Sequence, residues 1–454
     1  MKVTSSDSID KLLPDSPIQK ITTPIERLLR MEMTGGIVLI IMTIAALLWA
    51  NLSPDSYKHF FHQAVSLTIG SWTGSADLHW IINDALMTLF FFVVGLEVKG
   101  EITYGELRDP KAASLPIIAA AGGMLAPALI FLALCPPDAT RGWGIPTATD
   151  IAFVVGCMAI LGKKVPHALR VMILTLAIAD DIGAILVIAI GYPSGEGVVF
   201  TALGVAFACL VLINVLFRLG VRSFMIHLVL GIVVWAAFVK SGVHPTIAGV
   251  LLGLSIPAKS IVGSETLANY TARIGNFLQG GPAIDSHQKF EIFNTLKKGA
   301  RESLPLQERL YKTLNPWVNY LIMPVFALAN AGVHIESLDY FNIFEYSEVA
   351  GSIGMGVFFG LVIGKPLGIS LFSYLAVKFG LADKPVGATW SMLFAVACLG
   401  GIGFTMSIFV DNLAFNVDTC LEYINKGKIS ILMASTTAAL LGSLLIILNA
   451  KKSK

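Results

Sequence analysis

Long apolar runs dominate this sequence and limit what it can fold into. The runs are about 17 to 25 residues long, the length that a helix needs to cross the hydrocarbon core of a bilayer. Hydrophobic residue types make up 55% of the chain and charged types only 14%, whereas a typical soluble domain has about 25% charged residues. These charges are too few to cover the surface of a soluble protein of 454 residues. The sequence therefore predicts an all-α polytopic membrane protein.

Twelve of these runs have the composition and length of membrane spans, so we expect twelve transmembrane helices. The fourth and eighth runs are the shortest, and prolines and polar residues lie in or beside them. The predicted spans lie near residues 35–52, 80–98, 112–134, 145–161, 168–191, 198–217, 223–239, 245–258, 315–333, 350–377, 388–411 and 428–449.

Lysine and arginine are distributed unevenly between the two sides that these spans define. With the N-terminus in the cytoplasm, 26 of the 32 basic residues fall in cytoplasmic segments, 5 fall in outer segments and Lys365 falls inside a span. This asymmetry follows the positive-inside rule. A missed or extra span would reverse the assignment of every later segment and remove the asymmetry. We therefore expect both termini to be cytoplasmic.

The spans also define the domain organisation. The cytoplasmic insert has mixed charge and several glycines, and we find no catalytic motif in it. The predicted parts are an N-terminal cytoplasmic segment at 1–34, helices 1 to 8 at 35–258, the cytoplasmic insert at 259–314, helices 9 to 12 at 315–449 and a cytoplasmic tail at 450–454.

The outer loop 53–79 contains a short strand pattern. Apolar and polar residues alternate over 65–69, and the segment 70–74 that follows, Gly-Ser-Trp-Thr-Gly, supplies turn residues. Alternation followed by turn residues is typical of a β-hairpin. We therefore predict a small outer hairpin.

Two adjacent aspartates, Asp180 and Asp181, lie in the middle of the fifth predicted span. A charge in the membrane core costs about 2.5–3.5 kcal/mol on insertion scales. Adjacent helical residues point about 100° apart, so one carboxyl can face an ion cavity while the other faces a partner. Two like charges this close resist joint ionisation, and burial disfavours the charged form. Such a pair can hold a proton or a cation. The alternative is a pair bound by the backbone at a helix break, but apolar helical sequence continues on both sides.

Two spans contain helix-breaking residues. In the fourth span, Thr149 and Asp150 follow Pro146, and in the eleventh, Gly401 and Gly403 belong to a run with three glycines in four residues. Paired broken helices are the best sequence indication of a transporter binding site, because freed backbone groups are tolerated only where they line a cavity. The alternative for the glycines is close helix packing alone.

The two breaks occupy corresponding places in the chain. Each lies in the second span of a group of three, within 112–191 and within 350–449. This placement predicts inverted three-helix repeats whose two discontinuous helices cross at mid-membrane. The two groups show no residue-level identity.

The tenth span carries a glycine at every fourth position, namely Gly356, Gly360, Gly364 and Gly368. A ladder of small residues lets neighbouring helix backbones approach closely. Lys365 lies within the ladder and is too central to reach the interface. A lysine there must be neutral or paired with an anion, and Asp180 or Asp181 is the expected partner for charge compensation.

Other polar residues lie nearer the ends of spans. Asp84 and Glu97 lie toward the two ends of the second span, and Asp411, at the end of the eleventh, is expected to be a solvated cap. His244 begins the eighth span and is a candidate for pH sensing, because histidine titrates near physiological pH. Asn330, in the ninth span, is expected to form an interhelical hydrogen bond rather than to bind an ion.

Seven motifs occur in order across roughly residues 30–450 and resemble those of the NhaA-type bacterial sodium/proton antiporters. The motifs are FFVVGLEVKGE, IPTATDIAF, AIADDIGAI, KSGVHPTIAG, FALANAGV, GKPLGI and CLGGIGFTMSIF. The resemblance implies twelve spans, a crossing of the unwound fourth and eleventh spans, exchange of sodium or lithium for protons under pH regulation, and a homodimer formed through the outer hairpin.

Site roles follow from the resemblance at matching positions. Asp181 would be the main cation ligand and proton site, with Asp180 as the second carboxylate, pairing with Lys365. Thr149 and Asp150 would lie at the crossing, where Asp150 and Lys365 would balance helix dipole ends. Asp84 and Glu97 would line or guard the cytoplasmic entrance.

The sequence thus predicts a secondary active transporter of the bacterial inner membrane, not an enzyme. We expect electrogenic, pH-regulated export of Na⁺ or Li⁺ in exchange for H⁺ by alternating access, with Na⁺ held transiently by Asp181 and Asp180. We expect no cofactor and no nucleic-acid partner. The rival readings are a sodium-coupled symporter of an organic solute and a passive cation channel. The first needs polar anchors that the spans lack, and the second does not need a buried Asp–Asp–Lys set.

Overall fold

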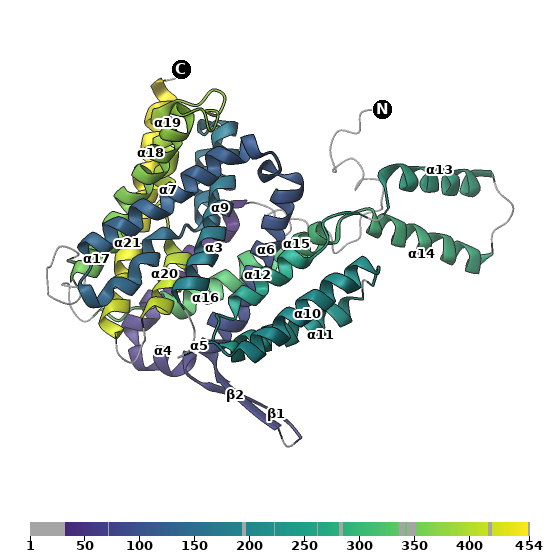
Figure 1. Cartoon of the computed structure of the whole chain (residues 1–454), viewed down its shortest axis with the longest axis horizontal. Helices are drawn as coiled ribbons and strands as arrows, with labels where there is room; N and C mark the ends of the chain where they lie inside the picture. Colours follow the sequence, from purple (N-terminus) through teal and green to yellow (C-terminus); the bar gives the residue numbers. More distant parts are fainter. Residues whose placement is uncertain are drawn as a thin grey trace.

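The computed structural model places most of the chain in one helical bundle with a small hairpin (Figure 1). It describes residues 32–70, 72–192, 197–221, 223–260, 262–280, 285–335, 341–342, 351–415 and 420–452. Nearly all of the predicted N-terminal segment 1–34 and the last two residues of the predicted tail 450–454 lie outside the described residues.

The helices follow the order of the predicted spans. The first half of the bundle consists of α3 (Glu32–Leu52), α4 (Pro54–Phe61), α5 (Leu78–Trp80), η1 (Ile81–Leu86), α6 (Met87–Tyr104), η2 (Glu106–Arg108), α7 (Pro110–Leu134), η3 (Pro137–Thr147), α8 (Ile151–Leu161), η4 (Gly162–Lys164), α9 (His167–Gly191), α10 (Phe200–Arg218), α11 (Phe224–Ser241) and α12 (Thr246–Ser255). The second half consists of α13 (Ser264–Gly280), α14 (Ser286–Glu302), α15 (Leu306–Trp317), η5 (Val318–Ile322), α16 (Met323–Asn330), α17 (Gly351–Phe359), η7 (Gly360–Gly364), α18 (Lys365–Lys378), α19 (Trp390–Gly400), α20 (Phe404–Ala414) and α21 (Leu421–Lys452).

Eight helices in the described part of the chain are long and apolar enough to cross a membrane. Two further pairs, η3 with α8 and α19 with α20, pass the same test as bent spans, with bends of 45° and 49°. These bends lie where the sequence predicted breaks. The eighth predicted span is the short apolar helix α12, and the ninth falls on the continuous stretch from α15 through η5 to α16.

The predicted hairpin is present, but its turn is shorter than expected. Strand β1 (Ala64–Ile69) pairs antiparallel with β2 (Trp72–Asp77), and Ile69 lies opposite Trp72. The loop is therefore two residues long, so Trp72 to Gly74 belong to β2 rather than to the turn. Gly70 has a φ of +63°, the left-handed conformation that two-residue hairpin loops need and that glycine adopts without strain. Ser71, also assigned to the turn, lies outside the described residues.

The insert contains two helices, α13 and α14, which project sideways from the bundle, at the right of Figure 1 and above the hairpin. Its end is tied to α6 through α15. The Gln307 side-chain amide donates to the backbone carbonyl of Leu96 over 2.6 Å, and the Tyr104 hydroxyl donates to that of Ala258 over 2.5 Å. These contacts hold the end of α6 against both ends of the insert.

The glycine ladder packs against α7 and η3, as the sequence predicted. A Cβ at Gly364 would lie 2.8 Å from the Cα of Pro127, and one at Gly368 would collide with the backbone carbonyl of Gly122. Backbone therefore approaches backbone between α7 and the continuous stretch of η7 and α18, because Gly364 and Gly368 present no side chain at these positions.

This packing predicts that Gly368→Ala destabilises the bundle. The added methyl has no room beside the Gly122 carbonyl, and overpacking of this kind costs about 1–3 kcal/mol. The matched control is Gly204→Ala in α10, where a Cβ would meet nothing within 4 Å. Thermal unfolding in detergent should show a lower midpoint for the first variant and an unchanged or slightly higher midpoint for the second, because alanine favours a helix over glycine. Equal midpoints would contradict the close contact.

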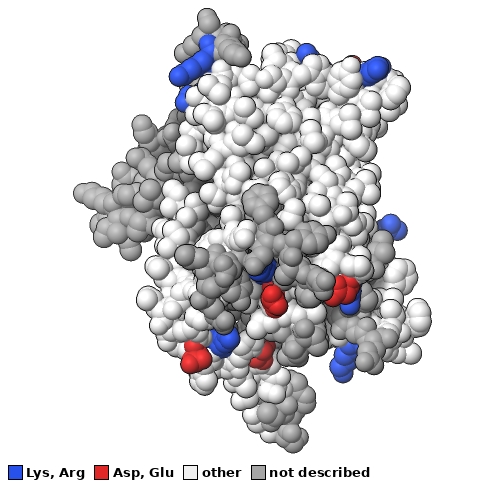
Figure 2. Space-filling view, turned by 90° about the vertical axis from the view of Figure 1, so that its left-hand side faces the viewer, with Lys and Arg blue, Asp and Glu red and all other residues white. Residues whose placement is uncertain are grey.

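Apolar side chains cover much of the outer surface as well as the core. On the face shown in Figure 2, charged residues gather at the upper rim and in the lower part, and the band between them is mostly uncharged. Large hydrophobic residues are exposed on the outer helices, among them Phe200, Phe207 and Phe224 at 79%, 68% and 61%. A surface this apolar is suited to hydrocarbon rather than water.

Candidate functional site

The two broken helices meet at their breaks. The Asp150 backbone N–H donates to the carbonyl of Ile402 over 2.7 Å, and the Thr149 hydroxyl donates to the carbonyl of Gly400 over 3.0 Å. Both acceptors lie at the end of α19, where the helix stops and frees its last carbonyls. Residues about 250 positions apart in the sequence therefore form hydrogen bonds that the two helix breaks would otherwise leave unmade.

Asp150 lies at the start of two half-helices. Its Oδ1 accepts from the Phe153 backbone N–H over 3.1 Å and caps α8, while its Oδ2 accepts from the Thr405 hydroxyl over 2.5 Å and from the Thr405 N–H over 3.3 Å in the first turn of α20. Helix N-termini carry partial positive charge. One carboxylate can therefore compensate two dipole ends, which provides a physical basis for the dipole role expected of Asp150.

The break in the eleventh predicted span is tightly packed and strained. A Cβ at Gly401 would collide with the Leu361 backbone carbonyl, and one at Gly403 would collide with the Ser407 hydroxyl. Both explanations for these glycines therefore apply: they are closely packed, and they lie at the helix break. Phe404 has a φ of +23°, an unfavourable backbone conformation for a bulky residue. Strain at this point is stored beside the crossing.

Lys365 is fully buried, so it does not reach the interface. Its ammonium lies 2.5 Å from Asp180 Oδ2 and also donates to the Thr149 hydroxyl. Thr149 in turn contacts the carbonyl end of α19, the negative end of that dipole. The structure therefore pairs Lys365 with Asp180, and it places the positive charge near a helix C-terminus.

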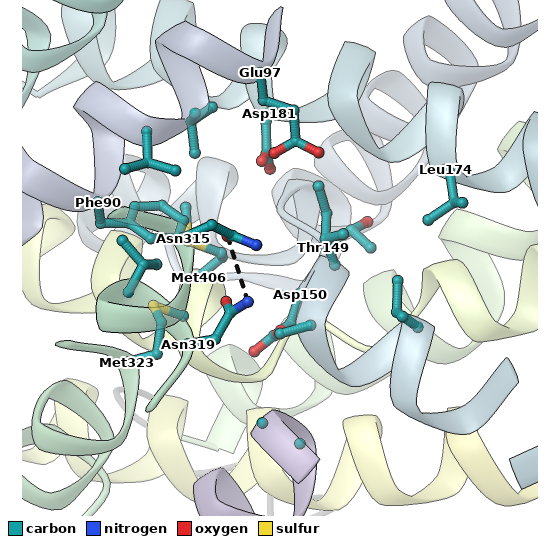
Figure 3. Close-up of a pocket in the computed structure, with 18 of the residues that line it drawn as sticks. Phe90, Glu97, Thr149, Asp150, Leu174, Asp181, Asn315, Asn319, Met323 and Met406 are labelled. Atoms are coloured by element: carbon teal, nitrogen blue, oxygen red, sulfur yellow. Dashed lines mark hydrogen bonds between the residues drawn. The ribbon is translucent and has the colours of Figure 1, made fainter. Parts of the chain in front are cut away.

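Asp181 faces away from this pair and into a cavity of about 380 Å³. Glu97 lines the same cavity, and Figure 3 shows both carboxylates toward one part of it, with Asn315 and Asn319 on another. Asp181 is 4% exposed. The predicted division between the two adjacent aspartates is present here: one is paired and the other borders open space.

The cavity is lined by several residues that the sequence analysis did not assign to a site. The Asn319 side-chain amide donates to Asn315 Oδ1 over 3.3 Å, and Tyr311 is hydrogen-bonded to Glu97. Tyr311 and Asn315 lie in α15, and Asn319 lies in η5. The mixed polar pattern of this part of the sequence gave no sign of an ion path. The described lining also includes Arg170, Met323 and Met406.

The structure places Asp84 and Glu97 apart. Asp84 does not line the cavity; it lies in η1, and its Oδ1 is 3.9 Å from His244 Nε2. The two acids are 13 positions apart in the sequence, which corresponds to about 20 Å along a helix. Asp84 therefore lies near the hairpin end of its helix, whereas Glu97 borders the cavity. The sequence pattern placed them toward the two ends of one span, and the resemblance assigned both to the cytoplasmic entrance.

The structure confirms the prediction made for Asn330 and contradicts the one made for Asp411. Asn330 forms interhelical hydrogen bonds, accepting from Asn83 and from Asn412 over 3.2 and 2.7 Å, as expected. Asp411 is not a solvated cap. It is 0% exposed, and neither carboxylate oxygen has a hydrogen-bond partner among the residues that the structure describes. The apolar run ended near this residue, but helix α20 continues past it and packs against α21.

A model of the family described as Na⁺/H⁺ antiporter 1 matches residues 26–446, which include every residue of the site. The chain belongs to this family. A protein of Rhodopirellula baltica named Na(+)/H(+) antiporter NhaA is 44% identical, with 95% of each chain covered. A protein of Sorangium cellulosum named Na(+)/H(+) antiporter NhaA 2 is 47% identical, with 92% of this chain and 88% of the relative covered. This family membership confirms the resemblance seen in the seven motifs.

Proposed function

We propose that this chain exchanges Na⁺ or Li⁺ for H⁺ across a membrane. The single observation that supports the proposal best is the arrangement of Asp181 beside the Asp180–Lys365 pair at the crossing of two broken helices. Family membership agrees, since the relatives carry the name of a sodium/proton antiporter. The protein would act as a secondary active transporter rather than an enzyme.

In the proposed cycle, sodium and protons compete for the same carboxylates. Asp181 binds a sodium ion from the cavity and releases its proton. The Asp180–Lys365 pair holds a second proton, which leaves when Lys365 changes partner. Competition for one site couples the two fluxes, because the site cannot move both ions in the same direction at once. Asp150 and Thr149 hold the half-helices in place around the site, with Gly401 and Gly403 at the second break.

The twelve spans and inverted repeats belong to the same proposal. One repeat would be α7, the bent pair η3–α8, and α9; the other would be α17–α18, the bent pair α19–α20, and α21. The similar bends of 45° and 49° in the middle member of each group support this assignment. Alternating access would then be movement of these groups around the crossing.

The cavity would be the cytoplasmic entrance, with Glu97 lining it. His244, which lies next to Asp84 and outside the cavity, would be a candidate for pH sensing. This orientation places both termini and the insert in the cytoplasm of a bacterium and the hairpin outside, consistent with the distribution of basic residues. A homodimer through β1 and β2 would pair the open strand edges of the hairpin.

Proton movement in sealed vesicles tests the function. Adding sodium to vesicles that contain the wild-type protein should drive protons in the opposite direction, and adding choline at equal ionic strength should not. Sodium uptake without any proton movement would instead support a channel, and sodium uptake that requires an organic solute would support a symporter.

Electrogenic exchange makes a separate prediction. If two protons cross for each sodium ion, one net charge moves per cycle, so a potassium-diffusion potential imposed with valinomycin should change the exchange rate. A potential that is positive on the side receiving the net charge should slow exchange, and the opposite sign should speed it. A rate that is independent of the imposed potential would contradict the two-proton stoichiometry and leave a one-for-one exchange.

A further inference from the structure

A further buried carboxylate, Asp411, lies outside the cavity and is not used in the cycle described above. It lies on α20, the same half-helix whose first turn binds Asp150 through Thr405. Six residues separate Thr405 from Asp411, which is about 9 Å along the helix toward the hairpin end of the bundle. The carboxylate therefore lies about two helical turns from the crossing, on the side opposite the cavity.

The surroundings of Asp411 are unusual for a structural acid. The side chain lies against the backbone of α21, where Gly427 has no side chain and so leaves room for it. Neither oxygen has a hydrogen-bond partner in the described part of the chain, and no ion pair within 4 Å joins it to another described residue. An isolated buried carboxylate is costly unless it is neutralised. A proton on Asp411 removes this cost without any rearrangement.

Two basic groups, Lys428 and His79, are electrostatically linked to Asp411, the second through the first. The charge of Lys428, on α21, acts on both Asp411 and His79. Burial decreases along this set, from Asp411 at 0% exposed, through Lys428 at 9%, to the half-buried His79. Tyr192 at the end of α9 also lies near Asp411, and its hydroxyl donates to the backbone carbonyl of Arg141 over 2.6 Å. Lys426, on α21, is a further buried basic residue, 8% exposed. Exposure therefore increases from the buried acid to His79.

A polar side-chain network follows the same course. The Asn412 amide, next to Asp411, donates to Asn330, which exchanges hydrogen bonds with Asn83 over 2.8 and 3.2 Å. Asn83 then contacts the ring of His79 at 3.1 Å. The network crosses from α20 through α16 to η1. It holds polar groups together near Asp411 within an otherwise apolar bundle.

We propose that Asp411 is a second proton-binding site, on the hairpin side of the crossing, which passes protons between outer water and the central carboxylates with Lys428 and His79 as its outer neighbours. The proposal rests on the proposed antiport function. A proton is the fitting ligand rather than sodium, because it neutralises the carboxylate within its tight packing against Gly427, where an added Cβ would collide with Oδ1, and needs no further oxygen ligands. In the transfer, Asp411 accepts one proton from the outer side and gives one to the central site, so its own charge is restored after each cycle.

The test uses the full-length protein in proteoliposomes of one orientation, so that pH can be varied on each face separately. Asp411→Asn cannot bind and release a proton. We expect its exchange rate to lose the wild-type dependence on hairpin-side pH, with a shift or flattening equivalent to about a tenfold change in proton concentration, that is one pH unit. Its dependence on sodium at the cavity side should stay unchanged. The matched control is Asp138→Asn, which removes an exposed acid on the same side that accepts from the Tyr423 hydroxyl.

Stability separates this role from a structural one. Removing an unpaired buried carboxylate should leave the thermal midpoint unchanged or raise it, whereas loss of a structural group should lower it. Lys428→Gln is the second variant: it should shift the same hairpin-side pH dependence toward alkaline pH, because the remaining carboxyl holds its proton more tightly.

Three results would overturn the inference. They are an unchanged hairpin-side pH dependence in both variants, a change in sodium dependence without a change in pH dependence, and an effect of equal size on both faces. If the wild-type protein itself shows no sodium-driven proton movement, the antiport function fails instead, which the same vesicles report independently.

Discussion

Asp181→Asn is expected to abolish sodium-driven proton movement in sealed vesicles. The amide keeps the size and shape of the side chain, but it carries no charge and has no exchangeable proton in the working pH range. Losing a charged contact of about 3 kcal/mol lowers occupancy about 100-fold, and the lost proton removes the coupling as well. Asp181 borders the cavity, whereas Asp180 is already held by Lys365, so the two aspartates should not substitute for each other.

The matched control for this variant is Glu97→Gln. It makes the same chemical change to another acid that lines the cavity. We expect slower exchange with a weaker sodium affinity, but measurable coupling, because Glu97 lies beside the central site rather than in it. Both variants should fold, since neither side chain is in an ion pair of the described structure. Coupled exchange that persists in Asp181→Asn would remove this residue from the centre of the mechanism.

Lys365→Ala is expected to lower stability strongly and to change the pH dependence of exchange. The substitution leaves Asp180 buried without its cation, and breaking a buried ion pair on one side costs about 3–5 kcal/mol. Asp180 can lower this cost by holding a proton, so the proton bound there would no longer be released in step with sodium. The expected readouts are a lower thermal midpoint in detergent and an altered pH profile in vesicles.

A double variant separates the two effects. In Lys365→Ala with Asp180→Asn, no unpaired charge is left at the pair, so stability should largely recover. Transport should not recover, because the second proton site is gone. An unaltered pH profile in Lys365→Ala would contradict the pairing role, and an unaltered thermal midpoint would contradict the burial of the pair.

Much of the helical layout could be predicted from the sequence because the bilayer imposes a length on each apolar run. The two broken spans were also visible, since Pro146 and the glycines near 400–403 interrupt runs that are otherwise apolar. The location of the charges Asp150, Asp180 and Lys365 inside apolar runs pointed to a site, because a charge at that depth has to be compensated.

Three-dimensional detail was not available from the sequence for physical reasons. Whether Lys365 contacts Asp180 or Asp181 depends on the rotation of two packed helices, which composition does not specify. Asp411 was taken for a solvated cap because an apolar run ends there, yet the packing of α20 on α21 buries it. The different surroundings of Asp84 and Glu97, at the two ends of one helix, also depend on which other helices pack beside each end.

The π turn η7, Gly360–Gly364, comes directly before Lys365. A π turn contains one residue more than an α turn, so it rotates the rest of the helix by about 100° relative to an unbroken α-helix. The azimuth of Lys365, and hence its contact with Asp180, is therefore set by five small and apolar residues that touch neither ion. A single-residue deletion in this turn would preserve the hydropathy of the span and every charged residue in it. It would also turn the ammonium away from its partner, so the length of this segment belongs to the site as much as the charges do.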